Sequence, residues 1–144
     1  MIIHSLSLLA PLFYFKKASD PFDIREEAEK DTIVEKLFCF EIDESQYLSF
    51  EPERTKLLEK LVFSGVSIEM ETDKPKKASL ELPKGNYLFA QKREILSREE
   101  IISLAVEIQL EALWQRLKPD KKLYLRYLYE DGSWVTQLFR PYAS

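Results

Sequence analysis

The side chains that most often carry out catalysis are scarce in this chain. It contains one histidine, His4, and one cysteine, Cys39. A Ser-His-Asp or Cys-His device would have to use His4, and neither a nucleophile elbow nor a second histidine accompanies it. Cys39 lies in the apolar run Leu37-Phe38-Cys39-Phe40, where a small buried hydrophobe is the expected role. No ligand spacing suggests a metal site, so we expect neither a metal nor a cofactor.

Binding chemistry is better represented than catalytic chemistry. The three glycines, Gly65, Gly85 and Gly132, occupy predicted turns, so no phosphate-cradling loop is present. What remains is an inventory of seven Tyr, nine Phe and two Trp, with a few Gln and Arg on predicted strands. A concave apolar site with a few placed polar groups is therefore the default hypothesis. Acidic residues are plentiful, but their abundance alone does not indicate a catalytic pair.

Composition narrows the class of protein. At 144 residues the chain has the length of a single domain with its own core. Its net charge of −4 argues against a nucleic-acid partner, and we read Lys74, Lys76 and Lys77 as solvated turn residues. The apolar N-terminus, residues 1–15, lacks the basic start and cleavage site of a signal peptide and is too short for a membrane span. One cysteine permits no internal disulfide and fits a cytoplasmic location.

The first half of the chain alternates predicted strands with two predicted helices. Asp20 followed by Pro21 starts a short acidic helix over 21–30, and a second helix begins at Ser49 or Glu51 and ends at Ser64 before a Gly65 cap. Strands are expected over residues 2–9, 12–15, 32–42, 66–71 and 78–82, from their apolar alternation.

The second half carries clearer signals. A strand is expected over 87–93, followed by a capping box at Ser97-Arg98-Glu99-Glu100 that starts a helix ending at Leu117. Gln109 and Arg116 fall within the apolar arc of this helix, where we expect them to extend to the edge of the core. Two aromatic strands, 123–129 and 134–140, flank an Asp131-Gly132 turn typical of a two-residue hairpin.

That turn fixes which side chains of the hairpin lie opposite each other. Tyr124 is expected to pair with Phe139, Arg126 with Gln137, and Leu128 with Val135 on one face. The other face would pair residue 125 with 138, 127 with 136, and 129 with 134. Both faces are rich in apolar groups, so both are expected to be covered.

The order of these elements repeats along the chain. Residues 32–82 and 83–144 each follow the order strand, helix, strand, strand, after an N-terminal extension over 1–31. We therefore predict an α+β single domain over 1–144, in which tandem β-α-β-β modules with two main helices share an antiparallel sheet. The groove between the modules would be a ligand site.

The segment Leu82-Pro83-Lys84-Gly85-Asn86-Tyr87-Leu88-Phe89 resembles the entry to the second half of GyrI-like domains. These are small-molecule-binding domains found alone or attached to AraC- and MerR-type regulators. The resemblance continues through the long helix to the closing Gln137-Leu138-Phe139-Arg140-Pro141 and covers residues 37–141. It implies two modules with a ligand held between them. The position where the family usually carries a pocket glutamate is Gln137 here, and no DNA-binding segment is found.

Three functions follow from this interpretation. The leading one is a stand-alone binding protein for a neutral or anionic aromatic small molecule, with orientation supplied by Arg126 and Gln137. The apolar walls would be Tyr87, Phe89, Trp114, Tyr124 and Phe139. The alternative is a protein–protein interaction module that acts on a partner enzyme through exposed strand edges and an acidic helix near residues 26–29. Hydrolysis ranks third, because Gln137 replaces the carboxylate and Glu94 and Glu111 are expected to point away from the pocket.

Gln137 leaves two interpretations open. It is either half of a satisfied cross-strand pair with Arg126 on a solvated face, or a groove residue whose change to glutamate would create an anionic site for lipophilic cations. The sequence does not settle the ligand or the oligomeric state.

Overall fold

The computed structural model describes residues 2–14, 33–68, 80–130 and 132–143. Among these, one α-helix, α1 (Arg98–Trp114), and one short 3-10 helix, η1 (Arg54–Lys56), accompany nine strands. The strands are β1 (His4–Leu8), β2 (Leu12–Tyr14), β3 (Ile33–Glu41), β4 (Leu61–Ile68), β5 (Leu80–Leu82), β6 (Gly85–Lys92), β7 (Lys118–Pro119), β8 (Lys122–Glu130) and β9 (Ser133–Ala143). The predicted α+β class is confirmed.

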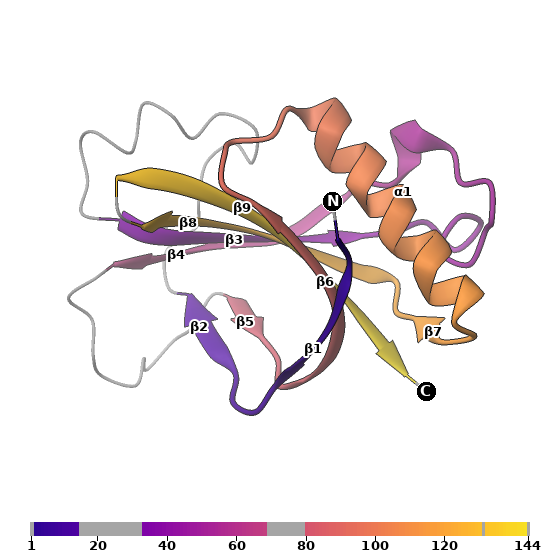
Figure 1. Cartoon of the computed structure of the whole chain (residues 1–144), viewed down its shortest axis with the longest axis horizontal. Helices are drawn as coiled ribbons and strands as arrows, with labels where there is room; N and C mark the ends of the chain where they lie inside the picture. Colours follow the sequence, from indigo (N-terminus) through magenta and orange to yellow (C-terminus); the bar gives the residue numbers. More distant parts are fainter. Residues whose placement is uncertain (1, 15–32, 69–79, 131, 144) are drawn as a thin grey trace.

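An antiparallel sheet forms the centre of the molecule (Figure 1). Its strand order is β1-β6-β9-β8-β3-β4, and β7 adds to the far end of β9. Strands β2 and β5 pair with each other as a separate two-stranded ribbon. Because β3 of the first half pairs directly with β8 of the second half, both halves of the chain contribute to one sheet.

The register predicted for the last hairpin is confirmed on both faces. Tyr124 lies opposite Phe139, Arg126 opposite Gln137, and Leu128 opposite Val135. The chain reverses between Glu130 and Ser133, and Gly132 has a φ of 77°, a conformation that costs glycine little. The turn thus places Arg126 and Gln137 side by side, as its sequence indicates.

The capping box at the start of α1 is also confirmed. The Glu100 amide donates to the Ser97 hydroxyl, and the Ser97 amide donates to the Glu100 carboxylate, both at 3.2 Å. The helix ends at Trp114 rather than at Leu117. Arg116 takes a φ of 59°, a left-handed conformation that stops the helix one turn earlier than the apolar pattern predicts.

Helix α1 covers one face of the sheet, together with the segment that joins β3 to β4 (Figure 1). Ile101, Ala105 and Ile108 of the helix pack against sheet residues such as Phe38 and Leu138. The opposite face carries a second apolar cluster, in which the β2–β5 ribbon covers the sheet with Tyr14 and Leu82. Both faces of the sheet are therefore covered, as expected.

The helix predicted from Ser49 or Glu51 to Ser64 is wrong. Residues 49–60 form turns and η1, whose first turn has no side-chain cap, and residues 61–68 form β4. Leu61-Val62-Phe63 has the branched and aromatic character of a strand, and pairing with β3 outweighs the helical spacing of the leucines. Gly65 is a buried strand residue opposite Leu37 and not a helix cap.

The two-module arrangement is therefore not confirmed, because among the described residues the expected long helix is present in the second half and absent from the first. The predicted acidic helix over 21–30, the lysine turn and the end of the strand over 66–71 lie outside the described residues. Within the described part of the chain, no helix is long and apolar enough to cross a membrane.

Candidate functional site

Four of the predicted wall residues lie together on the sheet face opposite α1. The Phe139 ring is 4.9 Å from that of Phe89 and 5.7 Å from that of Tyr87, and the Tyr87 and Tyr124 rings are 6.4 Å apart. Tyr87, Tyr124 and Phe139 are all buried, and they pack against Tyr14 of the ribbon. Burial raises the pKa of Tyr87 to about 12. These rings fill a core cluster and present no open aromatic wall.

Arg126 and Gln137 lie in a polar row on the same face. Arg126 donates to the Gln137 side-chain oxygen at 3.0 Å and to the Tyr14 hydroxyl at 2.9 Å, and it forms an ion pair with Glu35. Tyr14 donates to the other Glu35 oxygen at 2.7 Å, and Gln137 donates to Gln91 at 3.0 Å. The satisfied cross-strand pair is thus confirmed, although the face is covered and not solvated.

The polar row holds β2 on the sheet. Tyr14 is fully buried, and burial first, then the Glu35 carboxylate, raises the pKa of its hydroxyl. Burial lowers the pKa of Arg126, but Tyr14 and Glu35 raise it by more, so the guanidinium keeps its charge. Both Glu35 oxygens accept hydrogen bonds, which leaves this carboxylate arranged for structure more than for proton transfer.

Trp114 lies apart from the other predicted wall residues. It is the last residue of α1, its side chain is 76% exposed, and its ring contacts that of Phe50 edge to face at 6.0 Å between centroids. Phe50 is 55% exposed and Leu48 is 45% exposed, both in the segment that joins β3 to η1. We call Leu48, Phe50 and Trp114 the apolar patch.

Two buried polar side chains hold the segment that carries this patch. The Gln109 amide of α1 donates to the carbonyls of Gln46 at 2.9 Å and Ser49 at 2.6 Å. Arg140 of β9 donates to the Tyr47 carbonyl at 3.0 Å and to the Gln109 oxygen at 3.1 Å. Gln109 is fully buried and Arg140 is 1% exposed, so the expectation that Gln109 extends to the edge of the core is wrong.

Arg140 is held by oxygen atoms that carry no full charge. It also donates to the Asp120 carbonyl at 2.5 Å, so its three described hydrogen bonds reach two backbone carbonyls and one amide oxygen. Burial lowers the pKa of this guanidinium. We call Gln109 and Arg140 the clamp, because together they fix residues 46–49 against α1 and β9.

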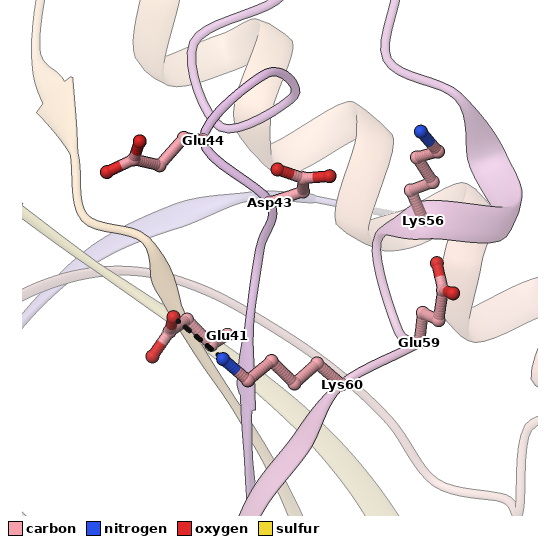
Figure 2. A pocket seen from close by; sticks show the side chains of 6 residues that line it. All are labelled: Glu41, Asp43, Glu44, Lys56, Glu59 and Lys60. Carbon is pink, nitrogen blue, oxygen red and sulfur yellow. Dashed lines mark hydrogen bonds and ion pairs between the residues drawn. The ribbon is translucent and has the colours of Figure 1, made fainter.

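An acidic pocket opens at the base of the same segment, with a volume of about 500 Å³ (Figure 2). It is lined by Glu41, Asp43, Glu44, Lys56, Glu59 and Lys60. Lys60 pairs with Glu41 at 3.3 Å, and Lys121 pairs with Glu44 at 2.5 Å and lowers the pKa of that carboxyl. Its polar, partly paired lining lacks the apolar walls of an ordinary small-molecule site.

The other candidates for chemistry lie in ordinary surroundings. His4 is exposed on edge strand β1, opposite Phe89. Cys39 is buried, as expected, and burial raises the pKa of its thiol to about 11. Glu94 pairs with Lys92 at 2.8 Å, and Glu111 accepts from Gln115 at 2.7 Å. Among the described residues, no group of three or more His, Cys, Asp or Glu side chains could hold a metal ion.

Sequence reasoning missed Leu48, Phe50 and the buried role of Gln109. The sequence gives a partial signal for Phe50. This large aromatic residue stands directly before Glu51-Pro52, where the first turn of the expected helix begins, and it does not belong to the apolar stripe of that helix. Nothing local indicates that Phe50 meets Trp114, since 64 positions separate them in the chain.

No family model matches this chain, and no curated protein matches it. The resemblance to GyrI-like domains therefore stays a prediction.

Proposed function

We propose that this protein is a protein–protein interaction module and that it binds another protein through the apolar patch. The observation that carries this proposal is the Phe50–Trp114 pair, two large aromatic side chains that lie in contact while 55% and 76% exposed. Tryptophan is among the side-chain types that are enriched in the residues that dominate binding energy at protein interfaces.

The way in which the patch is held supports the same conclusion. The clamp uses two buried polar side chains to fix the backbone at Gln46, Tyr47 and Ser49, directly before Phe50. A segment fixed before binding loses less conformational entropy when a partner docks, so more of the contact energy appears as affinity. A fixed, exposed aromatic pair has the properties of a preformed docking surface.

The partner is expected to be a different protein and not a second copy of this chain. The segment and the helix that carry the patch are both acidic, as their sequences show, so two patches brought face to face would repel each other. We expect the partner to be cytoplasmic, in line with a single cysteine that can form no internal disulfide.

The ligand groove predicted between the modules is less well supported. Tyr87, Tyr124 and Phe139 are 2–3% exposed and contact each other, and Trp114 lies on the other side of the sheet. A small aromatic molecule would have to displace the β2–β5 ribbon to reach these rings. Hydrolysis is supported still less, because Glu35, the carboxylate described beside Arg126, accepts hydrogen bonds at both oxygens.

The test places a photo-crosslinking amino acid at Gln115, next to Trp114, and at Leu9 as a control. Leu9 is 92% exposed and lies at the turn between β1 and β2. The expected result is one cellular protein crosslinked from position 115 and not from position 9. The double variant Phe50→Ser/Trp114→Ser should abolish the crosslink, whereas the matched surface variant Leu9→Ser should leave it unchanged. A crosslink that survives the double variant, or no protein captured at position 115, would contradict the proposal.

A further inference from the structure

The layer of the protein that carries the apolar patch holds more than its share of negative charge. Residues 43–60 and 97–115 lie together on one face of the sheet, joined by the clamp and by a 2.5 Å bond from Arg54 to Ser103 (Figure 1). In this layer, residues 43–60 contain five carboxylates and three basic side chains. Residues 97–115 contain four carboxylates and one basic side chain. Its net charge is therefore −5, while the whole chain carries −4. The rest of the molecule is close to neutral.

The carboxylates of this layer lie along both segments that carry the patch. On the connecting segment, Glu51 and Glu53 are exposed directly after Phe50, and the pocket of Figure 2 carries four carboxylates against two lysines. On α1, a second hollow of about 360 Å³ is lined by Glu99, Glu100 and Glu107, with Ser103 and Leu104. Glu51 and Glu53 lie beside Phe50 in the chain, and Glu107 lies about two turns before Trp114 on α1, whereas Glu99 and Glu100 lie in the first turn, at the other end of the helix. An incoming partner therefore meets an apolar centre with carboxylates beside Phe50 and further along α1.

We infer that the partner docks through a basic segment that also carries apolar side chains; this inference rests on the proposed function. Apolar side chains of the partner would contact Phe50 and Trp114, while its lysines and arginines would lie near Glu51, Glu53 and the exposed carboxylates of α1. Opposite charges beside an apolar centre select the partner and speed its association. A second copy of this chain and an anionic membrane surface carry the wrong charge.

Salt dependence follows from the exposure of these carboxylates. Because they are solvent-exposed, their attraction for a basic partner is screened over about 10 Å at 0.1 M salt and over about 3 Å at 1 M. The electrostatic part of binding is therefore expected to disappear at high salt, while the contact with the aromatic pair persists.

The inference is tested with two synthetic peptides that share the same leucine and tryptophan positions. One carries lysine at every remaining position and the other carries glutamate, and binding is followed by fluorescence anisotropy. The lysine peptide should bind about tenfold or more tightly than the glutamate peptide at low salt, and this difference should vanish near 1 M salt. Glu51→Lys should weaken binding of the lysine peptide about tenfold. The control is Glu81→Lys, which makes the same change in net charge at an exposed residue of β5. It should have little effect on binding of the lysine peptide.

The outcomes separate this inference from the proposed function. Equal affinity for both peptides, lost in Phe50→Ser/Trp114→Ser, would overturn the basic partner and leave the docking patch standing. Equal weakening by Glu51→Lys and Glu81→Lys would also overturn it, because the attraction would then be non-specific. Binding that survives the double variant would overturn the patch itself. Sedimentation that shows a patch-dependent dimer of this chain would overturn the basic partner in favour of a second copy.

Discussion

Replacing Gln109 with leucine tests whether the clamp fixes the segment that carries the apolar patch. The substitution keeps the size of the side chain but removes its bonds to the carbonyls of Gln46 and Ser49 and to Arg140. Each lost bond in buried surroundings costs about 1–3 kcal/mol, and the added apolar burial returns about 1–2 kcal/mol. We therefore expect Gln109→Leu to lower the free energy of unfolding by about 3 kcal/mol. A domain of ordinary stability stays folded after such a loss.

The control for this experiment is Gln115→Leu, the same substitution at a glutamine directly after the end of α1. Gln115 is exposed and bonds only to Glu111 one turn earlier among the described interactions, so Gln115→Leu should cost at most about 0.5 kcal/mol. Urea unfolding measures both variants, and hydrogen exchange at residues 46–50 reports the segment directly. Faster exchange there, confined to Gln109→Leu, is the expected result. A loss below about 1 kcal/mol with unchanged exchange would refute the clamp.

Three further predictions concern the opposite face of the sheet. The Cys39 thiol has a pKa of about 11, so it should react with a disulfide reagent at pH 8 at least about a hundredfold more slowly in the native protein than in denaturant. Because folding raises this pKa, the free energy of unfolding should fall by up to about 3 kcal/mol between about pH 9 and pH 11. If Cys39→Ala shows the same dependence of the free energy of unfolding on pH, the thiol is not its cause. Gln137→Glu should stay folded and gain no affinity for tetraphenylphosphonium, because Arg126 lies beside the new carboxylate; calorimetry that detects binding would restore the ligand groove.

Local signals predict the parts of this fold whose partners lie close in the chain. The Asp131-Gly132 turn determines the pairing of Arg126 with Gln137, because a two-residue loop leaves one register available. The box at Ser97 and Glu100 determines where α1 begins, because both hydrogen bonds form within one turn. The same reasoning placed Tyr87, Phe89, Tyr124 and Phe139 near each other, although it predicted an open wall where the structure has a packed core.

The errors arise where a distant partner decides the structure. Leu57, Leu58, Leu61 and Val62 have helical spacing, but residues 61–68 pair with β3, whose paired residues lie 21 to 35 positions earlier in the chain. Gln109 was expected to extend toward solvent, because its acceptors belong to a segment about sixty residues away. Trp114 was assigned to a pocket, because the sequence does not show where α1 lies relative to that segment. That placement determines how exposed Trp114 is. In each case the local pattern was compatible with two environments.

Two arginines, the partly buried Arg126 and the buried Arg140, show how peripheral segments are held on this sheet. Arg126 holds the β2–β5 ribbon through Tyr14 and Glu35, and Arg140 holds the segment before Phe50 through Gln109 and the Tyr47 carbonyl. Buried charged groups seldom add net stability compared with apolar packing of the same volume, but they specify one geometry because each donor needs its own acceptor. On the ribbon side, that geometry closes an apolar cluster. On the helix side, the same kind of fixed geometry leaves Phe50 and Trp114 exposed, with no second apolar layer over them among the described residues. The partner that we propose would cover the aromatic pair that this network fixes in an exposed position.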